Sequence, residues 1–114
     1  MKTNVLSMPC VIAYLYELVD ILYEKNYFGF ENSAVEYVVE LFEDITDNLP
    51  AKLGKPAPKY FERYGKNMEY ATFKKNKRTT WYVFFDTYKD NEEIIYLVRH
   101  IENNHTAAQH FDFR

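Results

Sequence analysis

The chain has 114 residues, a common size for one domain and enough to bury a hydrophobic core. Its single cysteine excludes a disulfide framework within the chain, so a reducing cytoplasm is the expected setting. Glu17 and Asp20 interrupt the apolar stretch over 11–22, which argues against a transmembrane span or a signal sequence. We therefore expect a single cytoplasmic domain over residues 1–114 that does not associate with membranes.

Charge is distributed unevenly along the chain. Residues 1–50 carry nine acidic and two basic residues, residues 51–80 carry nine basic and two acidic ones, and residues 81–114 carry three basic and six acidic ones. The total of −3 therefore hides a cationic segment, and such a segment can bind a polyanion. The alternative is that these lysines only keep a loop and a hairpin soluble.

The first part of the chain predicts two helices. Apolar residues recur at helical spacing over about 9–27 and again over about 32–48. The second helix begins with Ser33 and Glu36, which have the spacing of a capping box. A short link between two amphipathic helices predicts an antiparallel helical hairpin over about 9–48.

The rest of the chain predicts a sheet. Two prolines and a glycine within five residues indicate a basic loop over about 50–66. Segments rich in β-branched and aromatic residues predict strands at 67–75, 78–86 and 93–101. The connections are too short for crossover helices, so we expect a three- to four-stranded antiparallel meander over about 67–102. Residues 103–114 are expected to form a tail or a short helix. The predicted class is α+β, with the helical hairpin packed on the sheet.

Alternation along the strand at 78–86 sorts its side chains between two faces. Trp81, Val83 and Phe85 share one face, and this apolar set is expected to lie beneath the helices. Arg78, Thr80, Tyr82 and Phe84 share the opposite face. In the next strand, either Arg99 or His100 joins the Arg78 face, and the pairing register decides which of them does so.

This arrangement resembles the RelE/ParE superfamily of toxins from bacterial type II toxin–antitoxin systems. The likeness is best over Arg-Thr-Thr-Trp-Tyr-Val-Phe-Phe-Asp at 78–86 and over Ile-Ile-Tyr-Leu-Val-Arg-His-Ile-Glu-Asn-Asn-His at 94–105. It covers roughly residues 5–111 in the order of elements. Members usually begin with a strand before the first helix, and residues 3–6 are the candidate for it.

The resemblance implies one of two activities. The RelE-like branch resembles a metal-free ribonuclease that cuts messenger RNA in the ribosome, and the ParE-like branch resembles an inhibitor of DNA gyrase. We favour the ribonuclease because the basic turn lies beside Tyr82 and the Arg99-His100 pair. A toxin-fold module that binds proteins without catalysis is the third alternative. The implied partners are a cognate antitoxin and either the ribosome with messenger RNA or DNA gyrase; a homodimer is also compatible with the sequence.

RNA cleavage without metal needs a base for the ribose 2′-OH, cations for the phosphate and an acid for the leaving oxygen. Under the resemblance, Arg78 and Arg99 are the candidate phosphate clamps, since guanidinium offers a bidentate donor fork. Tyr82 and His105 are the candidate proton-transfer groups. The candidate substrate-binding residues are Lys74, Lys75 and Lys77. The alternatives are that Arg78 only flanks a turn and that Tyr82 is a half-buried sheet residue.

No cofactor and no metal are expected. His100, His105 and His110 are spaced five residues apart, so they do not share one helical face. No cysteine or carboxylate completes a recognised ligand spacing around them. The sequence also lacks a P-loop, a glycine-rich nucleotide fingerprint and a nucleophile elbow.

Overall fold

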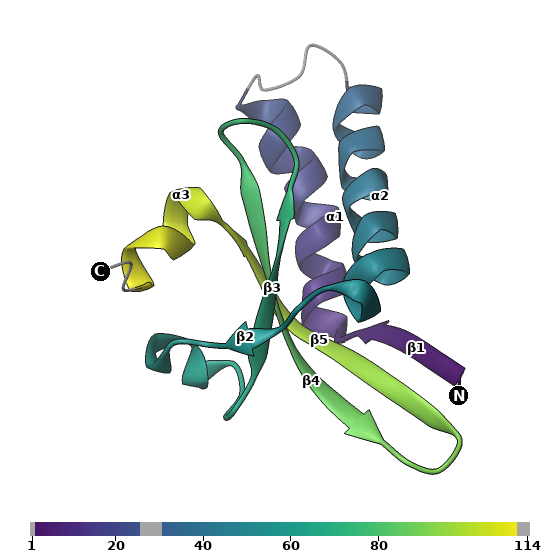
Figure 1. Cartoon of the computed structure of the whole chain (residues 1–114). Coiled ribbons are helices and arrows are strands. Elements are labelled where there is room, and N and C mark those ends of the chain that lie inside the picture. The colour runs from purple at the N-terminus through teal and green to yellow at the C-terminus, as the bar shows by residue number, and fades with distance from the viewer. Residues whose placement is uncertain (1, 26–30, 112–114) are drawn as a thin grey trace.

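The structure, a computed structural model, describes residues 2–25 and 31–111. It confirms the α+β class. Two long helices, α1 (Pro9–Glu24) and α2 (Glu31–Asn48), lie side by side against the sheet, and the short helix α3 (Asn104–Ala107) lies on its other side (Figure 1). The strands are β1 (Lys2–Ser7), β2 (Lys55–Pro56), β3 (Glu69–Lys74), β4 (Thr80–Lys89) and β5 (Glu93–Asn103).

The sheet is mixed and has five strands in the order β1-β5-β4-β3-β2. The expectation of three or four strands, all antiparallel, is therefore corrected. β1 pairs with β5 in parallel, with Val5 opposite Tyr96, and the other neighbouring strands pair antiparallel. The extra strand β2 has only two residues, including Pro56, and it lies at the edge of the sheet, where a missing N–H is tolerated.

Both long helices pack on the face of the sheet that the alternation predicted. Trp81, Val83 and Phe85 are buried there together with apolar residues of α1 and α2. The Trp81 ring lies edge-on to Tyr14 with centroids 6.4 Å apart, and its Nε1 donates a hydrogen bond of 2.9 Å to the hydroxyl of Tyr37. Among the described residues, no helix is both long enough and apolar enough to cross a bilayer.

The opposite face of the sheet, to which the alternation pattern assigns Tyr82, is also covered. A second buried cluster there contains Phe61 and Phe84, both fully buried, whose rings stack at 4.2 Å. Phe61 comes from a 3₁₀ turn at Lys59–Arg63 inside the expected basic loop. Phe111, near the end of the described chain, packs against Tyr82 with centroids 4.7 Å apart.

Several element boundaries differ from the predicted ones. α1 ends at Glu24, and the predicted end of that helix near residue 27 lies outside the described residues. α2 begins at Glu31, so Ser33 lies within the helix and not at its cap. β4 begins at Thr80, which leaves Arg78 in the preceding turn. Such shifts of a few residues are typical of boundary predictions from sequence.

The hydrogen bond from Trp81 to Tyr37 links the sheet to α2 and gives a first prediction. Tyr37→Phe deprives the buried indole N–H of this acceptor, which should lower the free energy of unfolding by about 1–3 kcal/mol. Urea unfolding followed by the fluorescence of Trp81, the only tryptophan, measures the change. Tyr16→Phe alters a ring that is 77% exposed and serves as the control. Equal stability of the two variants would contradict a structural role for this bond.

Candidate nucleic-acid interface

The turn between β3 and β4 presents a group of exposed cations. Lys74, Lys77 and Arg78 are all exposed, and no ion pair within the described residues joins any of them to an acid. The turn is closed by Asn76, whose Oδ1 accepts hydrogen bonds from the backbone N–H of Arg78 at 2.9 Å and of Thr79 at 3.0 Å. An asparagine in such a turn fixes the local backbone, so the cations project from a defined loop.

Asn104 joins the C-terminal segment to this turn. Its Nδ2 donates to the backbone carbonyl of Arg78 at 3.1 Å, and its Oδ1 accepts from the backbone N–H of Thr80 at 2.9 Å. The next residue, His105, is exposed in the first turn of α3, where its backbone N–H donates to Asn103. Arg78 and His105 therefore lie at the same end of the sheet.

Tyr82 lies further along β4, within the second aromatic cluster. Its ring contacts Tyr70 and Phe111, with centroids 5.9 Å and 4.7 Å away. Burial, followed by the nearby Tyr70 phenol, raises the pKa of Tyr82 above its ordinary value. The phenol is thus protonated at neutral pH, where it can donate a hydrogen bond but cannot act as a base.

Arg99 occupies a bulge in β5. Phe84 pairs with His100 while the next residue, Phe85, pairs with Val98, so Arg99 has no opposite residue in the ladder. A bulge rotates a side chain out of the regular alternation. Regular alternation would place only one of Arg99 and His100 on the face of Tyr82. Because of the bulge, both lie on that face, opposite the long helices.

The Arg99 guanidinium already has partners. Its Nε donates to the carboxylate of Asp86, and its Nη2 donates to the hydroxyl of Tyr88 at 3.1 Å. The hydrogen bonds to Tyr88 and to Asp86 raise the pKa of Arg99, so it remains a cation. These groups line a polar pocket of about 560 Å³ that also includes Lys66. Arg99 therefore has a carboxylate in contact, whereas no carboxylate in the described part of the chain pairs with Arg78.

His100 is held by its neighbours on the second face. Its ring stacks on Tyr64 at 3.7 Å with an interplanar angle of 6°, and its Nε2 lies 2.8 Å from Oε1 of Glu102. His110, the third histidine, stacks in the same way on Tyr60 at 3.3 Å. The His100 ring thus joins β5 to the end of the 3₁₀ turn at 59–63, and the His110 ring joins the C-terminal segment to the same turn. Both are structural uses of histidine.

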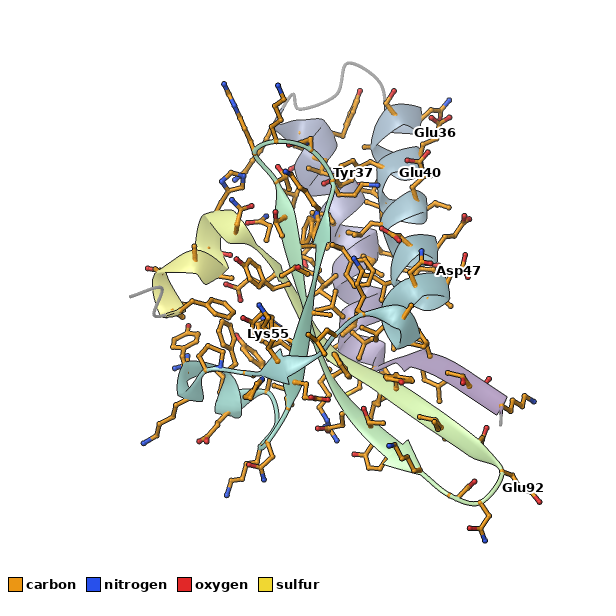
Figure 2. The ribbon with its side chains drawn as sticks, in the orientation of Figure 1. Glu36, Tyr37, Glu40, Asp47, Lys55 and Glu92 are labelled. Carbon is orange, nitrogen blue, oxygen red and sulfur yellow. The ribbon has the colours of Figure 1, made fainter. Side chains whose placement is uncertain are left out.

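The basic segment does not form one patch. Lys75 points toward α2, where its Nζ lies 3.9 Å from Glu40 and 5.2 Å from the ring centre of Tyr37; Figure 2 labels both partners. Lys52 lies over the ring of Phe73. Lys75 thus contacts α2, whereas the other predicted substrate-binding lysines, Lys74 and Lys77, are exposed.

The structure brings together four predicted residues at the turn, namely Lys74, Lys77, Arg78 and His105. It leaves Tyr82 and Arg99 elsewhere, and it directs the side chain of Lys75 from the turn toward α2. Sequence reasoning missed Asn104, which connects Arg78 to His105, and Asp86, which neutralises Arg99. Nothing in the local pattern marks these residues, because each partner lies at least 13 positions away in the chain.

Over residues 2–25 and 31–111, no group of three or more histidine, cysteine or acidic side chains is arranged to hold a metal ion. Comparison of the chain with protein-family models, curated proteins and solved structures gives no match.

The raised pKa of Tyr82 gives a prediction for alkaline solution. As the pH rises through about 10, the unfolded state releases the phenol proton before the folded state does, so stability should fall. Burial also raises the pKa of Tyr14, Tyr37 and Tyr64, so the fall should be reduced but not abolished in Tyr82→Phe. Urea unfolding at pH values from 8 to about 11 tests this, with Tyr16→Phe as the matched loss of a hydroxyl. An identical pH dependence in wild type and Tyr82→Phe would contradict it.

Proposed function

We propose that this chain is the toxin of a type II toxin–antitoxin pair with a RelE/ParE-like fold, and that it cleaves messenger RNA on the ribosome without a metal. The element order supports the resemblance. β1 precedes the two helices as an edge strand, and the two-residue β2 and three longer antiparallel strands follow them. A strand before the first helix is what the resemblance implies, and residues 2–7 supply it.

The observation that carries the proposal is the group of Lys74, Lys77, Arg78 and His105 at one end of the sheet. Three cations that have no acidic partner among the described residues can bind successive phosphates of a single strand. Arg78 is the best candidate for the scissile phosphate, since guanidinium can neutralise the charge that develops on two phosphate oxygens.

Histidine is the side-chain type that exchanges protons near neutral pH, so we assign proton transfer to His105. As a base it removes the proton of the ribose 2′-OH, and the oxygen then attacks phosphorus to give a 2′,3′-cyclic phosphate. The bond to the 5′-oxygen breaks, and that oxygen takes a proton from solvent. Asn104 would act as a positioning residue, because it holds the segment of His105 against Arg78.

A second candidate is an interaction module with a toxin fold and no catalysis. Two observations favour it: Arg99 is neutralised by Asp86, and Tyr82 is enclosed by aromatic rings. Both residues were expected to belong to the catalytic set. The module would still use the cationic turn for binding.

Inducible expression in a bacterial host tests the proposal. Growth should stop, with an early fall in protein synthesis by pulse-labelling, and primer extension should reveal cuts in ribosome-bound messenger RNA. Arg78→Ala together with His105→Ala should reduce cleavage at least ~100-fold and restore growth. Lys59→Ala together with Lys66→Ala removes two exposed cations elsewhere in the basic segment and should leave cleavage nearly unchanged.

The other outcomes separate the alternatives. An early fall in DNA synthesis, with intact messenger RNA, would replace cleavage by gyrase inhibition. Normal growth while folded protein accumulates, judged by the buried Trp81 fluorescence, would rule out an active toxin and leave the interaction module.

A further inference from the structure

The two long helices carry an apolar groove that neither the sheet nor the cationic turn uses. The groove has a volume of about 850 Å³ and is lined by residues of α1 between 12 and 20 and of α2 between 35 and 43. Its apolar side chains include Tyr16, which is 77% exposed, Val39 at 46% and Val35 at 39%. Exposed apolar side chains gathered in one groove are typical of a binding surface.

Each helix has a second apolar stripe beside the one in the core, and the two second stripes line this groove. On α1, Val11, Leu15 and Leu18 pack in the core beneath the helices, and the residues that follow them, at 12, 16 and 19, are apolar and line the groove. α2 repeats the pattern, since its groove residues Val35, Val39 and Phe42 directly follow three buried residues. Adjacent helix residues are about 100° apart, so each helix is apolar over a wider arc than packing on one sheet requires.

The charge of the hairpin indicates what covers this surface. α1 and α2 contain nine acidic residues and no lysine or arginine. Glu17, Asp20 and Glu43 line the groove itself. A partner therefore has to bring positive charge around an apolar centre.

We propose that the groove binds an amphipathic α-helix of a partner protein, with lysine or arginine flanking its apolar stripe. Nine residues of helix span about 13 Å, so the groove matches two to three turns of a partner helix with apolar residues at i, i+4 and i+7. A second copy of this hairpin and an anionic membrane surface would both meet like charge here. The inference rests on the helices alone and does not depend on the proposed RNA cleavage.

The test measures binding of three labelled 18-residue peptides to the full chain by fluorescence polarisation. The first has leucine at helical spacing with lysine and arginine elsewhere. The second has the same composition in an order that scatters the leucines, and the third replaces the basic residues of the first with glutamate. The first peptide should bind at least ~10-fold more tightly than the other two.

Variants locate the binding. Val35→Ser with Val39→Ser removes exposed apolar surface and should weaken the first peptide about 10-fold, with the fold intact. Glu17→Gln, Asp20→Asn and Glu43→Gln together should weaken it several-fold and flatten its salt dependence. The matched control is Glu24→Gln, Glu36→Gln and Asp47→Asn, which makes the same change of charge on the same helices away from the groove.

Three results would overturn the proposal. Equal binding of the scattered peptide, or equal effects of the two charge-removing triples, would mean that general electrostatic attraction and not the groove holds the peptide. A dimer of the wild-type chain in sedimentation experiments that dissociates in Val35→Ser with Val39→Ser would mean that a second copy covers the groove.

Discussion

Strand β4 has large apolar side chains on both faces, so each face of the sheet needs a layer of chain that shields it from water. Trp81, Val83 and Phe85 face the helices, while Phe84 is equally buried on the opposite side. The long helices cover the first face. The second is covered by chain that would otherwise be loop, because Phe61 and Phe111 pack onto Phe84. Aromatic burial of this kind fixes the path of the basic segment and of residues 104–111.

The layer that covers the second face also determines which polar side chains are accessible to a ligand. Tyr82 and His100 lie among the rings and take structural contacts there. The bulge at Arg99 allows a cation near this cluster to turn toward Asp86 at the edge of the aromatic packing. Reactive side chains therefore remain accessible where the cover ends, and the turn before β4 is such a place.

The elements that could be predicted from the sequence are those that depend on the residues of the element itself. Both long helices, the three long strands and the inward face of β4 follow from periodicity and composition. β1 was only suggested by the resemblance, and its parallel partner lies about 90 residues away. The bulge depends on pairing that no single strand encodes, so the position of Arg99 could not be derived. Of the candidate site, the turn cations were found, but their link to His105 through Asn104 is a tertiary contact.

The separation of charge along the sequence persists in the fold. If the acidic helices lay against the basic turn, their carboxylates would compete with any phosphate for the cations. Within the described residues, one ion pair joins the two regions, from Lys75 to Glu40, whose side chain is 71% exposed. At 3.9 Å, and with the Glu40 carboxylate largely exposed to solvent, this pair contributes about 1 kcal/mol at most, and it leaves Lys74, Lys77 and Arg78 available. A molecule with a net charge of −3 can thus present a cationic end and an acidic groove as two separate surfaces, and each attracts a partner of opposite charge.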